Sequence, residues 1–130
     1  MARRPKIDPL AQQTVLAMAG CRVGIGAASF LATGPAMRAA GLGEANATGR
    51  AIGKVAGGRD LALGLLTFAV RDDRQALATV ALAAALLDAA DAAAFSFAAV
   101  EPETRRGGAI GVLVAAAAAL VGFWSFRRLS

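Results

Sequence analysis

Long runs of apolar residues with almost no charge restrict what this chain can fold into. Leu10 to Gly34 holds a single charged residue, Ala76 to Val100 holds two, and Ala109 to Phe126 holds none. A helix needs about 20 apolar residues to cross the hydrocarbon core of a bilayer. In that core the backbone polar groups must be paired internally, as they are in a helix. The three runs therefore predict three membrane-spanning helices, the last of them short but uncharged.

A fourth span is predicted from a weaker signal. Leu61 to Val70 is apolar but too short to cross a bilayer by itself. Extended back to Ala51 it reaches the required length, with Lys54, Arg59 and Asp60 in its first half. We interpret this segment as a helix whose charged half is shielded by its neighbours or lies at the membrane interface. The alternative is a shallow or re-entrant segment.

The predicted fold is one all-α transmembrane domain, residues 1–130, built as an antiparallel bundle of four transmembrane helices. Gly34-Pro35 is expected to end the first helix, because the residue before a proline is driven out of the helical conformation. A short interfacial helix is expected around Met37 to Leu42. The charged turn Arg71-Asp72-Asp73-Arg74 makes spans two and three antiparallel neighbours, and Glu101-Pro102-Glu103 ends span three. The predicted spans are residues 10–33, 51–70, 75–99 and 107–126.

Basic residues at the ends of these spans predict the orientation of the chain. An even number of spans places both termini on one side of the membrane. The basic residues on that side are Arg3, Arg4, Lys6, Arg71, Arg74, Arg127 and Arg128. Fewer lie on the other side, namely Arg38, Arg50, Lys54, Arg105 and Arg106. Because cytoplasmic loops carry an excess of Lys and Arg, we expect a multi-pass protein of the plasma membrane with both termini in the cytoplasm.

The first span resembles a processed leader in one respect. Met18-Ala19-Gly20-Cys21 loosely imitates a lipoprotein cleavage site. However, Gln12 and Gln13 interrupt the apolar region before it, and the apolar run continues past Cys21 to Leu31. An uncleaved first span is therefore favoured over processing.

The amino-acid composition excludes several classes of function for this chain. A net charge of +5 suggests nucleic acid in a soluble protein, but here the basic residues flank apolar spans. The expected partners are the lipid bilayer and either other membrane proteins or further copies of the chain, and not nucleic acid. With no His and one Cys, the chain has no His-based zinc or haem site, no intrachain disulfide and no His-activated nucleophile. We expect no metal, no cofactor and no enzymatic activity.

Five ionisable residues lie within or beside the predicted spans. They are Arg22, Arg59, Asp60, Asp88 and Asp91. Charges at membrane depth are costly, so they normally pair with one another or face a cavity. Two arginines and three aspartates sum to −1, so two ion pairs leave one carboxylate over. We expect that carboxylate to be protonated, to hold a cation or the amine of a ligand, or to lie at the interface.

The function predicted from these charges is a small integral membrane protein with a structural or accessory role, in which a buried Arg/Asp network fixes the register of the helices. The alternative is binding or transport of a small amphiphile, cation or proton at Asp60, Asp88 and Asp91. Asp88 and Asp91 are three residues apart and therefore share a helix face. Arg59 lies about 100° from Asp60 around its helix and is expected to face a different neighbour or the interface.

Glycines spaced four residues apart predict close packing of helices, because they let another backbone approach one helix face. Pairs with this spacing occur on spans one, two and four, and one further glycine shares the Asp60 face of span two. The predicted packing residues are Gly20, Gly24, Gly53, Gly57, Gly64, Gly107 and Gly111. Packing within one bundle is favoured over a dedicated dimer motif.

Three segments carry a resemblance to a known group. They are Cys21-Arg22-Val23-Gly24 with the later Gly34-Pro35, Gly57-Gly58-Arg59-Asp60-Leu61-Ala62-Leu63-Gly64, and Leu87-Asp88-Ala89-Ala90-Asp91. Together they resemble a family of small four-span bacterial membrane proteins of unknown function, frequent in actinobacteria and DoxX-like in layout. The resemblance implies a fold and a membrane location but no activity. DoxX-like proteins are sometimes linked to redox partners, and this chain lacks the cysteine pairs of a direct redox role.

Overall fold

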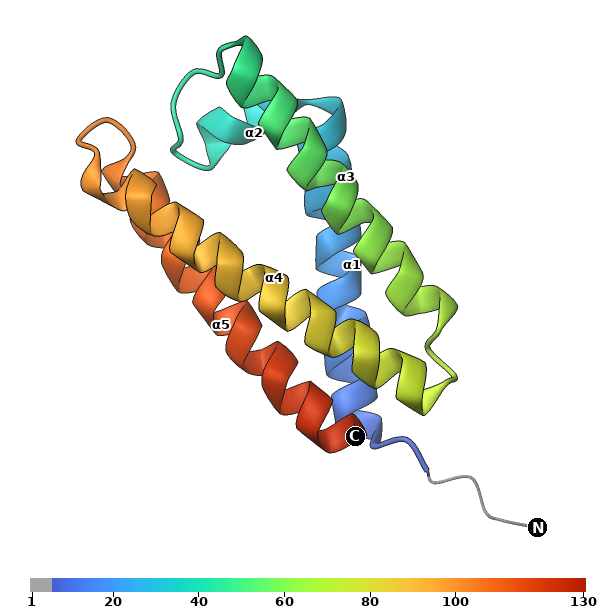
Figure 1. The fold of residues 1–130 in the computed structure, drawn as a ribbon. Helices are drawn as coiled ribbons and strands as arrows, with labels where there is room; N and C mark the ends of the chain where they lie inside the picture. Colours follow the sequence, from blue (N-terminus) through green and yellow to red (C-terminus); the bar gives the residue numbers. More distant parts are fainter. Residues whose placement is uncertain (1–5) are drawn as a thin grey trace.

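The computed structural model of the chain describes residues 6–130, which form five α-helices and no strand. The prediction of an all-α fold is confirmed. The helices are α1 (Pro9–Leu31), α2 (Thr33–Ala39), α3 (Ala47–Ala69), α4 (Arg74–Val100) and α5 (Arg105–Leu129). Four of the helices have 23 to 27 residues, and the short α2 connects α1 to the loop before α3 (Figure 1).

Three of the long helices, α1, α4 and α5, are long and apolar enough to cross a membrane. This supports the predicted membrane location. Helix α3 has 23 residues, the same number as α1, but it does not meet the same standard of apolarity. Its charged residues are the cause, because Lys54, Arg59 and Asp60 lie in its first two-thirds.

Side-chain caps fix where three of the long helices begin. The carboxylate of Asp8 accepts hydrogen bonds from the backbone N–H groups of Leu10 and Ala11, at 3.0 and 3.1 Å. Asn46 caps α3 and Asp73 caps α4 in the same way. The first N–H groups of a helix have no partner within the helix, so such caps stabilise each start by about 1 kcal/mol.

The junction between α1 and α2 corrects the predicted end of the first helix. The break is at Ala32, whose φ of −132° and ψ of 51° lie outside the helical region. Pro35 instead lies in the first turn of α2, where a missing N–H costs no hydrogen bond. The short helix expected around Met37 to Leu42 exists but spans Thr33–Ala39, and Gly41 follows it with a φ of 72°.

The long helices pack as two antiparallel pairs, α1 with α3 and α4 with α5. Glycines permit close contact within each pair. A Cβ on Gly57 would lie 2.7 Å from the backbone nitrogen of Phe30, and one on Gly64 would lie 2.7 Å from Val23. In the other pair, a Cβ on Gly111 would lie 2.5 Å from the ring of Phe95. Gly53 and Gly107, also among the predicted packing residues, likewise leave no room for a Cβ.

Gly20 and Gly24 are exceptions to the predicted packing. A Cβ added to either would meet no atom within 4 Å, and both residues are exposed. The face of α1 that contacts α3 instead carries Val23 and Gly26. Gly24 directly follows Val23, and neighbouring positions on a helix differ by about 100°. Gly24, and Gly20 four residues before it, therefore point away from α3. A spacing of four residues predicts a stripe of glycine but not which stripe meets the partner helix.

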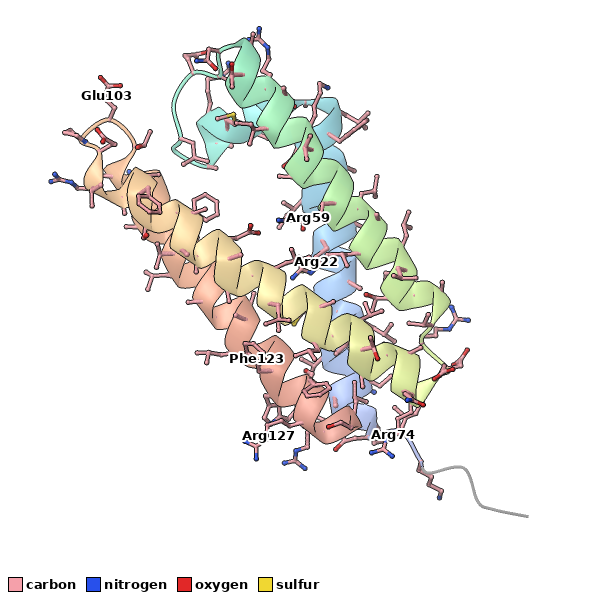
Figure 2. All side chains as sticks on the ribbon, viewed as in Figure 1. Arg22, Arg59, Arg74, Glu103, Phe123 and Arg127 are labelled. Atoms are coloured by element: carbon pink, nitrogen blue, oxygen red, sulfur yellow. The ribbon has the colours of Figure 1, made fainter. Side chains whose placement is uncertain are left out.

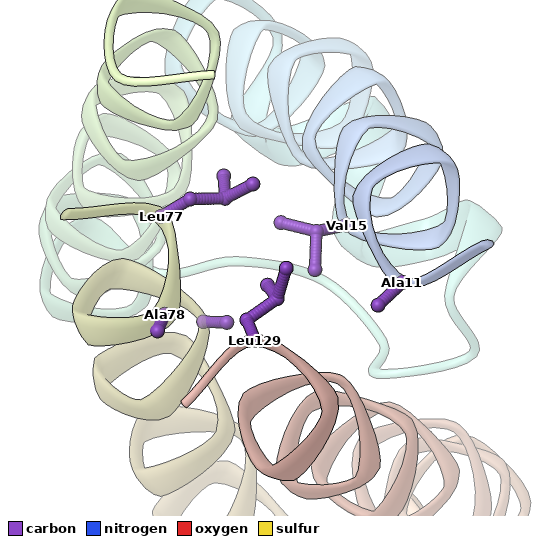
Figure 3. Packing of buried hydrophobic residues seen from close by; sticks show 6 residues of the cluster. Ala11, Val15, Leu77, Ala78 and Leu129 are labelled. Carbon is purple, nitrogen blue, oxygen red and sulfur yellow. The ribbon is translucent and has the colours of Figure 1, made fainter. Parts of the chain in front are cut away.

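The two pairs meet in an apolar cluster at one end of the molecule (Figure 3). It joins Ala11 and Val15 of α1 to Leu77, Ala78 and Ala81 of α4 and to Leu129 of α5. The side chain of Gln12 also donates to the carbonyl of Arg71 at 2.8 Å. The start of α1, the turn between α3 and α4, and the end of α5 therefore lie together. Away from this end the long helices of the two pairs diverge (Figure 1), and contact resumes where Gly41, after α2, lies against Gly107 of α5.

Candidate ion-pair site between the helix pairs

The five ionisable residues predicted at membrane depth come together as one alternating chain of charges. Arg22 binds Asp88 at 2.5 Å through Nη2 and Asp60 at 3.1 Å through Nη1. Arg59 binds Asp91 through both terminal nitrogens, at 2.6 and 3.1 Å. Arg59 Nη2 also lies 3.4 Å from Oδ1 of Asp60. The order is thus Asp88, Arg22, Asp60, Arg59, Asp91, which we call the charge chain.

The charge chain connects three helices from both pairs. Arg22 is on α1, Arg59 and Asp60 are on α3, and Asp88 and Asp91 are on α4. Figure 2 shows the side chains of Arg22 and Arg59 directed into the space between α4 and the α1/α3 pair. Asp60 contacts α1 while the adjacent Arg59 reaches α4, in keeping with the 100° between them. Asp88 and Asp91, one turn apart on α4, each meet one arginine.

Burial falls steadily along the charge chain. The side chains of Asp88 and Arg22 are 8% and 12% exposed, whereas those of Arg59 and Asp91 are both 30% exposed. Breaking a buried pair by removing one partner leaves an uncompensated charge and costs about 3–5 kcal/mol. The Arg22–Asp88 pair is therefore the contact whose loss is most costly.

Neither the charges nor the hydrogen bonds of the charge chain are fully balanced. The three carboxylates and two guanidinium groups leave a formal charge of −1. Within residues 6–130, no side chain donates to the second oxygen of Asp60 or of Asp88. In addition, the Nε of Arg59 is buried and has no hydrogen-bond partner in the described part of the chain. Hydrogen-bonding capacity therefore remains beside the ion pairs.

The space beside the charge chain is small. A cavity of about 20 Å³ lies against Arg22, lined by Met18 and Ala19 of α1, Thr67 of α3, and Val80 and Ala84 of α4, among others. This is room for about one water molecule. Pockets for small organic ligands measure about 300–1,000 Å³. The cavity does not have the size of a site for an amphiphile.

Lys54, one of two basic residues in the first half of α3, is separate from the charge chain. Its ammonium group donates to the carbonyl of Phe30 at 2.7 Å and lies 5.3 Å from the centre of the Phe30 ring. The last carbonyls of a helix have no partner within the helix, so a cation is favourable there. Lys54 thus binds the end of α1 and is solvent-exposed, as expected for a charge near an interface.

Sequence reasoning missed the arrangement at the end of α5. Trp124, Arg127 and Arg128 line a surface hollow together with Leu120 and Phe123. The guanidinium of Arg128 lies 5.7 Å from the centre of the Trp124 indole ring. A signal was present in the sequence, since a tryptophan next to basic residues at the end of an apolar run is typical of a membrane interface.

Comparison of the chain with protein-family models, curated proteins and solved structures finds no match in any of the three.

Proposed function

We propose that this chain is a four-span protein of the plasma membrane with a structural or accessory role, in which the charge chain holds two helix pairs together. The observation that carries the proposal is that all five charges at this depth bind one another across helices from different pairs. Within residues 6–130 no catalytic constellation accompanies them, and the adjoining cavity has room for about one water. A network in which every charged group pairs with another member across the helices is suited to holding those helices together.

The proposal that α3 spans the membrane has two supports. First, α3 packs antiparallel along α1, with Gly64 near Val23 and Gly57 near Phe30. Second, Arg59 and Asp60 are paired by groups from α1 and α4. Ionised groups within a membrane helix are tolerated when they face the protein interior and are paired. The shallow alternative would leave α1 without the partner helix along its length.

The four-span layout is also that of the small DoxX-like bacterial membrane proteins that the segment from Gly57 to Gly64 resembles. Membership of that group, in an actinobacterial setting, is part of the proposal. A direct redox function is not, because the lone Cys21 has no second cysteine to pair with.

The accessory role is tested by the mass of the complex that the chain forms at its native expression level. The tagged chain is extracted in a mild detergent and its mass is measured by native mass spectrometry. We expect a stable assembly of defined stoichiometry, with either another membrane protein or further copies of the chain. A monomer carrying only lipid would remove the basis for an accessory role.

A second candidate function is binding of a small cation, as the alternative to a purely structural network. It is favoured by the formal charge of −1 and by the free oxygens of Asp60 and Asp88. For this function, Asp88→Asn and Asp91→Asn should abolish binding of sodium, measured by calorimetry on the purified protein, while leaving helix content unchanged. Loss of the fold in both variants, or no sodium binding by the native chain, rejects this candidate.

A further inference from the structure

A surface hollow lies at the end of α5, apart from the charge chain. It has a volume of about 460 Å³ and is lined by Leu120, Phe123, Trp124, Arg127 and Arg128. Its lining combines two guanidinium groups with aromatic and aliphatic side chains. It lies on the last turns of α5, at the end of the molecule where the chain terminates (Figure 2).

The length of α5 places this hollow at a membrane surface. The residues from Gly107 to Phe126 carry no charge and are bounded by Arg105-Arg106 and Arg127-Arg128. These 20 residues extend about 30 Å at about 1.5 Å each, which equals the thickness of the bilayer hydrocarbon core. The two arginine pairs therefore coincide with the two interfaces when α5 spans the membrane.

The charges in the hollow are only partly compensated. Arg128 lies 3.8 Å from the carboxylate of Asp8 and stacks near Trp124. Arg127 forms no ion pair with any described residue and is exposed. A guanidinium group offers several donors in a planar fork that matches the oxygens of a phosphate. The aromatic and aliphatic lining suits the acyl region just below a headgroup.

We infer that the hollow formed by Leu120, Phe123, Trp124, Arg127 and Arg128 binds the headgroup of an anionic phospholipid. Arg127 is the main contact to the phosphate, and Arg128 adds charge that Asp8 partly offsets. Trp124 and Phe123 contact the upper acyl chains. The inference rests on the membrane placement in the proposed function, specifically on α5 crossing the bilayer, and adds a lipid-binding site to it.

Trp124 is the only tryptophan of the chain, so its fluorescence reports on this site alone. The full chain is reconstituted in phosphatidylcholine vesicles in which a fraction of the lipid is replaced by brominated phosphatidylglycerol or by brominated phosphatidylcholine. Bromine quenches the indole on contact. A basic residue near an anionic surface contributes about 1 kcal/mol, or about fivefold, so we expect phosphatidylglycerol to be preferred at Trp124 by about fivefold or more.

Two double variants locate the effect. Arg127→Gln with Arg128→Gln should reduce the preference to about onefold, since the favourable charge is removed. Arg105→Gln with Arg106→Gln removes the same charge at the other interface and should leave the preference unchanged. The single variant Arg127→Gln keeps the Arg128–Asp8 contact and should lose at least half of the preference for phosphatidylglycerol. This variant replaces the double variant in the test if the double variant fails to fold.

The outcomes separate the lipid site from the membrane placement. Equal quenching by the two brominated lipids overturns the headgroup site while leaving α5 in the membrane. An equal loss of preference in both double variants also overturns the site, because the effect would then reflect total charge. Absence of quenching by either lipid contradicts the membrane placement of α5 itself and removes both proposals.

Discussion

Asp60 holds the central place among the charged residues, because one of its oxygens is within 3.4 Å of both arginines. Arg22 and Arg59 each have a second carboxylate of their own, Asp88 and Asp91 respectively. Neutralising Asp60 would therefore leave two one-to-one ion pairs and no net charge. Neutralising Arg22 would leave Asp88 with no cationic partner in the charge chain.

This asymmetry gives a prediction for two variants that each replace a charged side chain with an uncharged one. Asp60→Asn should lower the free energy of unfolding by about 1 kcal/mol, the typical effect of weakening a hydrogen bond. Arg22→Gln should lower it by about 3–5 kcal/mol, because a buried carboxylate loses its partner. The measurement is unfolding by sodium dodecyl sulfate in mixed micelles, followed by circular dichroism.

Equal losses in the two variants would contradict this account of the charge distribution. A large loss for Asp60→Asn alone would point to the cation-binding function instead, because the negative charge of Asp60 would then be needed for more than pairing with the two arginines.

At the scale of helices, contact between α1 and α3 depends on glycines that bring the two backbones together. Gly57 faces backbone atoms of α1, with the space for a Cβ lying 2.8 Å from the carbonyl oxygen of Gly26. Backbone cannot move aside as a flexible side chain can. Gly20 belongs to α1 and lies on its exposed face, away from α3. A Cβ added there would meet no atom within 4 Å.

Two alanine variants test this contact. Gly57→Ala should destabilise the protein by about 1–3 kcal/mol, the usual cost of overpacking. Gly20→Ala should leave stability unchanged or raise it by up to about 1 kcal/mol, because alanine favours helix and meets no neighbour. Both are compared in the same micelle unfolding assay. A loss in Gly20→Ala as large as in Gly57→Ala would mean that α1 presents a different face to its partner.

The helices show which local features the sequence predicts well. The predicted helix positions rest on the apolar runs. The capping by Asp8, Asn46 and Asp73 is also a local interaction, but it was not predicted. The break at Ala32 was predicted instead at Gly34-Pro35, because proline is common both just past the end of one helix and in the first turn of the next. The partner of each glycine face depends on tertiary contacts that spacing alone does not contain.

At the scale of the whole molecule, the two helix pairs are joined by the apolar cluster near Leu77 and Leu129 and by the charge chain. The sequence identified the five members of the charge chain, because charges within apolar runs stand out. It did not predict that Asp60 is shared between both arginines. That arrangement follows from how the pairs are placed relative to one another, which no periodicity in the sequence encodes.

The four-span layout predicts which loops share a side of the membrane. In a Cys21→Ser background, single cysteines are introduced as Glu44→Cys, Asp72→Cys, Glu103→Cys or Ser130→Cys. A membrane-impermeant maleimide should label the variants at 44 and 103 in intact cells, and those at 72 and 130 only after permeabilisation. The reason is that the start of α1, the turn after α3 and the end of α5 lie together, away from the loop after α4.

Labelling of the variants at 44 and 72 from the same side would mean that α3 does not cross the membrane. Labelling of all four on the sides opposite to those expected would keep the four spans and reverse the predicted cytoplasmic position of the termini.

The central claim, that the charge chain holds the two helix pairs together, is tested most directly by a double-mutant cycle on Arg22 and Asp88. Free energies of unfolding are measured for the native chain, Arg22→Gln, Asp88→Asn and the double variant, with the exposed pair Arg38–Glu44 as a control. We expect a coupling energy of about 2 kcal/mol or more for Arg22–Asp88 and below about 0.5 kcal/mol for the control. A coupling below about 0.5 kcal/mol for Arg22–Asp88 would contradict the claim.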